Sequence, residues 1–193
     1  MHAPKNVSEL FELYEVHGSE PYGEAITQTE HALQCASLAR GERASDAMIA
    51  AALFHDVGHL VADVQNGPDF RLDADDDDHE AVGARVLAPL FGPSVAGPVS
   101  MHVTAKRWRC STDPGYFERL SEASKMTLKA QGGLLSEEEC LRFEEHPGFP
   151  DALALRTWDD EGKIEGLDVG VLADYEGLIS SLAAAWSRAR RER

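Results

Sequence analysis

Six side chains have the types and the spacing of a two-metal site. In chain order they are His31, His55, Asp56, His79, His102 and Asp159. Imidazole and carboxylate groups suit iron, manganese and zinc, and a carboxylate can bridge two cations that would otherwise repel each other. His55 and Asp56 are neighbours at the end of an apolar segment, and neighbouring residues on a helix point about 100° apart. This pair can therefore serve two different metals, or it can let Asp56 bridge them.

The elements that must position these side chains are predicted to be helices. Apolar residues recur at helical spacing along nearly the whole chain, and the alternation typical of strands is almost absent. The expected helices are one that starts at Val7 and ends at Gly18, followed by residues 24–40, 47–57, 78–91, 94–106, 121–130, 136–145, 149–158 and 172–191. The segment 47–57 is apolar almost all round, which predicts a central buried helix that Gly58 closes. The predicted fold class is all-α.

A run of acidic residues precedes His79, and its members are Asp73, Asp75, Asp76, Asp77 and Asp78. We expect a solvated loop that also caps the helix carrying His79, because carboxylates are favoured at helix N-termini. The alternative is a rim that attracts cations to the metal site.

Length, charge and cysteines limit the class of protein. The 193 residues predict one domain, with a metal-binding core at about 22–165 and a C-terminal helix at about 171–191. The formal net charge of −16 argues against a nucleic-acid partner, because phosphate binding needs a basic surface. No apolar run is long enough for a membrane span, and the N-terminus lacks the apolar segment of a signal peptide. The three widely spaced cysteines indicate free thiols, so we expect a cytoplasmic protein with no membrane partner.

The order of the candidate ligands resembles that of the HD-domain superfamily, whose members bind one or two metals in a helical bundle. Residues 53–59 (Leu-Phe-His-Asp-Val-Gly-His) match its core motif closely. The resemblance implies that His31, His55, Asp56 and a late aspartate hold one metal, and that Asp56 bridges to a second metal held by His79 and His102. Residues 157–163 (Thr-Trp-Asp-Asp-Glu-Gly-Lys) resemble the end of myo-inositol oxygenase, which selects Asp159 as the late ligand and leaves Asp160 as the alternative.

Three further segments resemble the small HD oxygenases that cleave organophosphonates. They are residues 22–34, 120–128 and 131–133, and the resemblance extends from about Glu9 to Leu178. It implies a mixed-valent Fe(II)/Fe(III) pair that uses dioxygen to oxidise C1 of a 1-hydroxy-2-aminoethylphosphonate or its trimethylammonium counterpart. The products would be phosphate and glycine or glycine betaine. The acidic run slightly favours the trimethylammonium substrate, because diffuse negative charge needs no hydrogen-bond match. The main alternative is an HD phosphohydrolase of a nucleotide or phosphomonoester; a regulatory module and a polyol oxygenase are the others.

Lys106, Ser124 and His59 are candidate substrate contacts. Lys106 lies four residues after His102, so both project from one helix face, and its ammonium group can bind a phosphonate as a point charge. The alternative is a solvent-facing lysine at a helix end. Ser124 would donate a hydrogen bond to the phosphonate, unless it bonds back to its own helix. His59 follows His55 by four residues and could reach either the substrate or a metal ligand.

Arg156, Tyr22 and Glu24 complete the candidates. Arg156 stands three residues before Asp159 and could contact the substrate anion or support that carboxylate. The family resemblance implies that Tyr22 caps the iron and that Glu24 binds the substrate amine or the tyrosine. In the family pattern the tyrosine stands three residues before the glutamate, whereas Tyr22 stands two before Glu24, and Pro21 occupies the expected place. Ordinary loop and helix-turn contacts are the alternative for both residues.

Overall fold

The chain forms helices, and no strand is present among the residues that the structure describes. The structure is a computed structural model, and it describes residues 3–19, 25–66 and 78–192. Its helices are α1 (Val7–His17), α2 (Gln28–Gly41), α3 (Asp46–Phe54), α4 (Val57–Asn66), α5 (His79–Phe91), α6 (Pro93–Thr112), α7 (Pro114–Arg119), α8 (Glu122–Ala130), α9 (Glu137–Glu144), α10 (Phe149–Glu161) and α11 (Ala173–Arg191). The predicted all-α fold class is confirmed.

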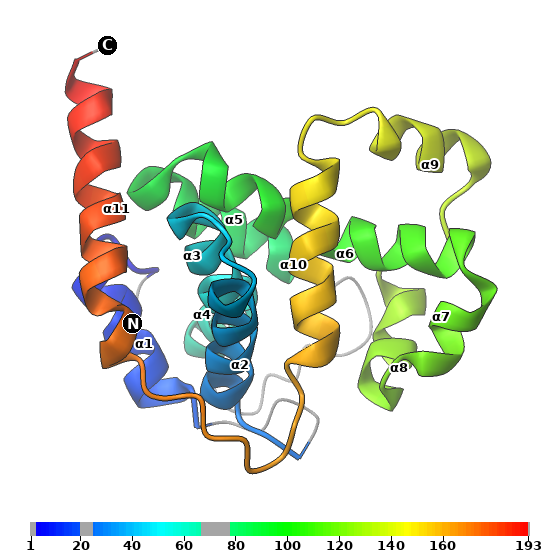
Figure 1. Cartoon of the computed structure of the whole chain (residues 1–193), viewed down its shortest axis with the longest axis horizontal. Coiled ribbons are helices and arrows are strands. Elements are labelled where there is room, and N and C mark those ends of the chain that lie inside the picture. Colours follow the sequence, from blue (N-terminus) through cyan, green and yellow to red (C-terminus); the bar gives the residue numbers. More distant parts are fainter. Residues whose placement is uncertain (1–2, 20–24, 67–77, 193) are drawn as a thin grey trace.

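Helix α3 is the centre of the bundle, as its all-round apolar sequence predicts. Residues 48–54 are all buried, and α3 contacts α2, α6, α10 and α11. Figure 1 shows the neighbouring helices grouped around it, with α11 running along one side of the molecule. Ser45 begins the helix because its side chain accepts a hydrogen bond from the backbone N–H of Met48. The core thus holds the end of α3, and with it His55, in a fixed place.

The predicted helix over 47–57 is wrong at its C-terminal end. Helix α3 ends at Phe54, His55 and Asp56 form a turn, and α4 begins at Val57. Gly58 therefore does not close a helix but lies in the first turn of α4. A Cβ atom there would lie 2.0 Å from the backbone oxygen of His79, so Gly58 permits the close approach of α4 to α5.

We expect Gly58→Ala to destabilise the fold by about 1–3 kcal/mol, the usual cost of overpacking. The methyl group would meet backbone atoms of His79, and these cannot move without shifting α5. Chemical denaturation measures the change in the free energy of unfolding. Gly177→Ala is the matched control, because a Cβ atom at this position in α11 meets nothing within 4 Å and alanine favours a helix. Equal stability of the two variants would contradict the close approach.

Other helix boundaries differ from the predicted ones. Thr27 caps α2 in a reciprocal capping box with Glu30, so this helix starts at Gln28 and not at residue 24. Helix α6 continues past residue 106 to Thr112, and α10 continues past residue 158 to Glu161. The short helix α7 was not predicted. These extensions place Lys106 in a helix interior and Asp159 on a helix.

The expected capping of α5 by the acidic run is wrong for the one member that the structure describes. Asp78 is exposed and occupies the N-cap position, but its side chain makes no capping hydrogen bond. The other acidic residues, at 73–77, lie outside the described residues.

Helices α7 and α8 pack beside α6, at some distance from the main core (Figure 1). Their small apolar cluster contains Cys110, Tyr116, Leu120 and Leu128. None of the described helices combines the length and apolar character needed to cross a bilayer. The single-domain organisation over 1–193 stays a prediction.

Candidate metal centre

The fold brings the six predicted metal ligands together from five places in the bundle. His31 comes from α2, the turn between α3 and α4 carries His55 and Asp56, and the remaining three come from separate helices: His79 from α5, His102 from α6 and Asp159 from α10. Each of the six side chains is buried, with an exposed fraction between 0% and 6%. Burial of this many ionisable groups is costly unless they pair or hold a cation.

Asp56 lies between two pairs of histidines. Its Oδ2 atom is 3.4 Å from His55 Nε2 and 3.7 Å from His31 Nε2. Its Oδ1 atom is 3.4 Å from His79 Nε2 and 3.5 Å from His102 Nε2. The two oxygens of one carboxylate therefore face different pairs, which is the arrangement expected of a bridging ligand.

The first half of the site contains His31, His55 and Asp159. The Nε2 atoms of the two histidines are 3.2 Å apart, and Asp159 Oδ1 is 3.4 Å from that of His31. The Nδ1 atoms point away to backbone carbonyls, at 2.8 Å for His31 with Gly162 and 2.9 Å for His55 with Ala52. These contacts orient both rings so that Nε2 faces the site, as outer contacts do for metal-binding histidines.

His79 and His102 form the second half, with their Nε2 atoms 3.0 Å apart. Burial and the neighbouring His79 hold the pKa of His102 well below its usual value, so its imidazole is neutral. The Nδ1 atom of His102 lies 2.8 Å from the Val99 carbonyl and must donate to it. The lone pair of Nε2 therefore faces Asp56 and His79. An unprotonated nitrogen and a carboxylate oxygen that face one point favour a cation there.

The first half also holds two ionised carboxylates. Burial alone would raise the pKa of both carboxyl groups. The neighbouring His55 outweighs burial for Asp56, and Arg156 does so for Asp159, so each pKa lies well below its usual value. Burial likewise opposes charge on His55, but Asp56 and Asp159 outweigh it and raise the pKa of His55 to about 10. The same field that holds a proton on His55 would attract a metal ion in its place.

Two buried carboxylate oxygens support the fit of a metal. Asp56 Oδ2 and Asp159 Oδ1 are buried and have no hydrogen-bond partner among the described residues. An unsatisfied buried acceptor is unfavourable, and a bound cation would satisfy both. The donor set of imidazoles and carboxylates matches iron better than calcium or magnesium, which prefer oxygen ligands alone.

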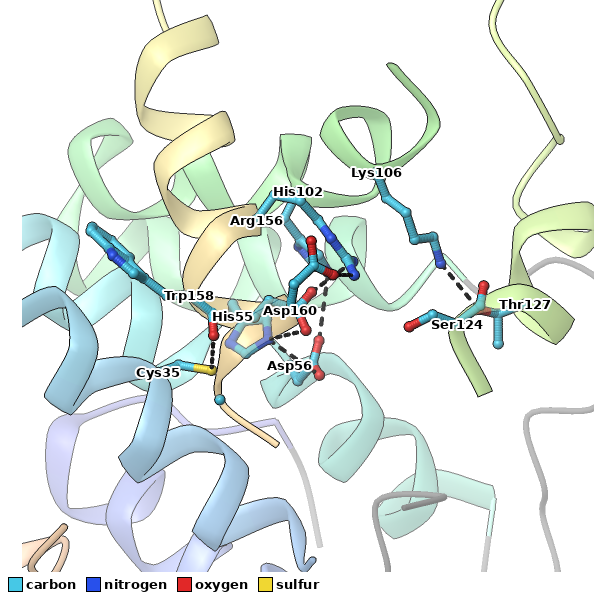
Figure 2. A network of polar contacts seen from close by, with 12 residues as sticks. Cys35, His55, Asp56, His102, Lys106, Ser124, Thr127, Arg156, Trp158 and Asp160 are labelled. Carbon is cyan, nitrogen blue, oxygen red and sulfur yellow. Dashed lines mark hydrogen bonds and ion pairs between the residues drawn. The ribbon is translucent and has the colours of Figure 1, made fainter. Parts of the chain in front are cut away.

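Cys35 lies beside this half, and its Sγ atom is close enough to His31 and His55 for the three to hold one ion. The Sγ atom is 3.7 Å from His31 Nδ1 and donates to the Trp158 carbonyl at 3.3 Å. Burial raises the pKa of this thiol well above its usual value. Figure 2 shows this contact joining α2 to α10.

A group of cationic and hydroxyl side chains adjoins the metal centre. Lys106 is 3% exposed, which excludes the solvent-facing alternative, and its Nζ atom donates to Thr127 Oγ1 at 3.0 Å. Lys163 Nζ lies 3.5 Å from Ser124 Oγ and 3.4 Å from Asp159 Oδ1. In Figure 2 the Lys106 side chain reaches from α6 toward α8, which carries Ser124 and Thr127. We call Lys106, Ser124, Thr127 and Lys163 the anion cluster, because ammonium and hydroxyl donors together suit a phosphonate or phosphate group.

Arg156 and Asp160 differ from Asp159 in what they contact. Arg156 is buried, and its Nη1 atom lies 2.7 Å from Asp159 Oδ2. Asp160 pairs with Arg156 and Arg109, whereas Asp159 Oδ1 faces His31 and His55, so the geometry favours Asp159 as the late ligand. His59 is half-buried, and its ring stacks on that of His79 with 4.0 Å between centroids. His59 therefore lies beside a candidate metal ligand, and its predicted contact with the substrate stays a prediction.

Sequence reasoning missed four side chains near the site. Thr127 and Lys163 belong to the anion cluster, and Tyr116 and Arg109 contact Arg156 or Asp160. Lys163 ends the segment 157–163 whose resemblance selects Asp159, four residues earlier, but no role was predicted for it. Thr127 could have been found, because it stands three residues after Ser124. Nothing in the sequence signals Tyr116 or Arg109. Tyr22 and Glu24 lie outside the described residues, so their roles stay predictions.

Comparisons with known proteins place the chain in a family. It is 44% identical to a hydroxymethylphosphonate dioxygenase of Gimesia maris over 177 residues, which are 92% of this chain and 88% of the relative. It is 40% identical to a glycine-betaine-forming [1-hydroxy-2-(trimethylamino)ethyl]phosphonate dioxygenase of Leisingera caerulea, over 78% of this chain and 76% of the relative. It is also 34% identical to the uncharacterized protein L432 of Acanthamoeba polyphaga mimivirus, over 91% of this chain and 80% of the relative. No protein-family model matches the chain.

These relatives confirm the predicted oxygenase and give no support to the phosphohydrolase alternative. Dioxygenase relatives imply a metal cofactor, and the His and Asp clusters described above could bind it. The relation to HD-domain proteins and to myo-inositol oxygenase stays a prediction. The chain belongs to the family of the phosphonate dioxygenases, and it is an oxygenase.

Proposed function

We propose that the chain cleaves the carbon–phosphorus bond of a 1-hydroxyalkylphosphonate with dioxygen, giving inorganic phosphate and a carboxylate. The observation that carries this proposal is the position of Asp56 between two histidine pairs, with the anion cluster next to one of them. The two relatives named above act on phosphonates of this kind. One hydroxyalkylphosphonate and one dioxygen contain the atoms of the carboxylate, hydrogen phosphate and a proton, so no other co-substrate is needed.

The proposed cofactor is a pair of iron ions in the mixed-valent Fe(II)/Fe(III) state. His31, His55, Asp56 and Asp159 would hold one ion, and His79, His102 and Asp56 the other. When bound, the pair would supply the redox chemistry that activates dioxygen and oxidises C1 of the substrate. The second half offers fewer protein ligands than the first, so an ion held there would leave room for the substrate and dioxygen.

The residues of the anion cluster would bind and orient the phosphonate group. Lys106 offers a positive charge, and the hydroxyl groups of Ser124 and Thr127 offer hydrogen bonds whose direction fixes the phosphonate oxygens. Lys163 contacts both Ser124 and the candidate ligand Asp159, so an anion held by this cluster would lie against the first half of the metal centre. This placement would bring C1, which is bonded to phosphorus, close to the metals.

The group beyond C1 determines which phosphonate is preferred. The relatives differ at this point, since one acts on hydroxymethylphosphonate and the other on a trimethylamino compound. The predicted amine contacts lie outside the described residues; they are Tyr22, Glu24 and the acidic residues between positions 73 and 77. We therefore propose the hydroxyalkylphosphonate class and keep the trimethylammonium compound as the predicted member.

The test is to measure dioxygen consumption and phosphate release by the iron-loaded enzyme. Hydroxymethylphosphonate, 1-hydroxy-2-aminoethylphosphonate and its trimethylammonium counterpart are compared side by side. One phosphate per dioxygen is expected, and the ratio of kcat/KM values identifies the group beyond C1. Phosphate release from simple phosphate esters without dioxygen uptake would overturn the proposal in favour of a hydrolase.

We also propose a cytoplasmic location. All three cysteines are free and buried, as expected of a protein that works in a reducing compartment.

A further inference from the structure

Tyr116 joins helix α10, through Arg156 and Asp160, to a small apolar cluster beside the anion cluster. This residue of α7 is 6% exposed, and its ring belongs to the apolar cluster formed with Cys110, Leu120 and Leu128. Its hydroxyl group accepts a hydrogen bond from Arg156 Nε at 2.9 Å and donates one to Asp160 Oδ2 at 2.6 Å. Ring and hydroxyl therefore make contacts of two different kinds.

The hydroxyl group helps to fix the guanidinium of Arg156. The three nitrogens of this group have separate partners: Nη1 pairs with Asp159, Nη2 with Asp160, and Nε with Tyr116. Asp160 is itself held by Arg109 Nη1 at 3.4 Å. A planar group held at all three nitrogens has one orientation, so Arg156 holds Asp159 Oδ2 in one place. The other oxygen of Asp159 then stays turned toward His31.

The ring of Tyr116 belongs to the same apolar cluster as a residue of α8, the helix that carries the hydroxyl groups of the anion cluster. Leu128 belongs to the same apolar cluster and directly follows Thr127 on α8. Among the described residues, no side chain of α8 is part of the main core, so this small cluster and a few polar contacts hold the helix against α6. Loss of the packing should therefore shift Ser124 and Thr127 relative to Lys106.

We propose that Tyr116 is a positioning residue for both halves of the reaction site. Its hydroxyl group fixes Asp159 through Arg156, and its ring fixes Ser124 and Thr127 through α8. The assignment of Asp159 and of the anion cluster rests on the proposed function, whereas the contacts of Tyr116 do not. The two roles are separable, because phenylalanine keeps the ring and removes only the hydroxyl group.

Two variants test the two roles by binding measurements that need no turnover. Tyr116→Phe should weaken the binding of Mn(II), added anaerobically as the probe, by about 10- to 100-fold, which is the usual effect of losing an outer contact to a metal ligand. It should leave the dissociation constant of inorganic phosphate nearly unchanged. Leu128→Ala should do the reverse, weakening phosphate binding while Mn(II) binding stays as in the unmodified enzyme. Tyr175→Phe, a buried tyrosine of α11 away from the site, is the matched control and should change neither constant.

Unchanged Mn(II) affinity in Tyr116→Phe would overturn the role of the hydroxyl group, even if the variant melts at a lower temperature. Equal changes of both constants in both variants would show general loosening and would overturn the separation of roles. If Tyr116→Phe does not fold, Asp160→Asn removes the charge that accepts the hydrogen bond of the Tyr116 hydroxyl group and pairs with Arg156, and it should give the same selective loss of Mn(II). If the unmodified enzyme cleaves no phosphonate, the proposed function fails, whereas the Mn(II) comparison still decides the inference.

Discussion

An Asp56→Ala enzyme should bind neither of the two proposed iron ions firmly and should release phosphate at least about 1000-fold more slowly. Metal ions contribute several kcal/mol to such reactions, and each 1.4 kcal/mol corresponds to about a factor of ten in rate. The reason for the double loss is geometric, since one carboxylate faces both histidine pairs at 3.4 Å. Metal content per chain, measured by elemental analysis, and phosphate release check the two parts of the expectation.

The matched control for this prediction is Asp151→Asn. Asp151 is an exposed aspartate in the first turn of α10, so its loss of charge should leave metal content and rate unchanged. Two iron ions per chain in Asp56→Ala would mean that the bridge is assigned to the wrong residue. One remaining ion would mean that Asp56 serves only one pair.

Lys106→Ala should lower kcat/KM for the phosphonate by about 100-fold, mainly through a higher KM. A hydrogen bond to a charged group contributes about 1.5–3 kcal/mol, and this lysine is buried beside the hydroxyl groups of Ser124 and Thr127. Steady-state kinetics measure the change. The control is Lys129→Ala, which removes an exposed lysine from the last turn of α8. Unchanged kinetics in Lys106→Ala would exclude this residue as the phosphonate contact.

The same lysine should make kcat/KM decrease at alkaline pH. Burial, with Arg156 nearby, lowers the pKa of Lys106 to about 8. The ammonium group is charged below this pH and neutral above it, so kcat/KM, which reports groups of the free enzyme, should fall as the pH rises through about 8. The Lys106→Ala variant should not show this decrease. An identical decrease in that variant would mean that another group causes it.

Much of the candidate site could be predicted from the sequence, because the ligand types and their order carry the information. His31, His55, Asp56, His79 and His102 are groups that can bind metals, and His55 and Asp56 end an apolar segment, where ionisable residues are uncommon. The structure brings all of them together. Asp159 and Asp160 could not be separated by spacing alone, and the contacts of Arg156 with both were needed to distinguish their surroundings.

What could not be predicted depends on contacts between distant parts of the chain. Gly58 looks like a helix end because glycine often follows one, yet its role comes from the backbone of His79, which lies 2.0 Å from where a Cβ would be. The local sequence around Tyr116 has no pattern that predicts contact with Arg156 on another helix. Lys106 was expected near a helix end, and its burial follows from the extension of α6 to Thr112.

The spread of the candidate ligands over five segments has a consequence for the chain as a polymer. A cation that binds residues between 31 and 159 would close several long loops at one point, as a set of cross-links does. The unfolded chain would lose this closure together with the ion, so occupancy of the centre and folding would be linked. Ligands with at most 6% exposure also leave little room for exchange with solvent. Release of a bound ion would then require the helices to part, and the lifetime of the loaded protein would be set by the rate of opening and not by the strength of the coordinate bonds.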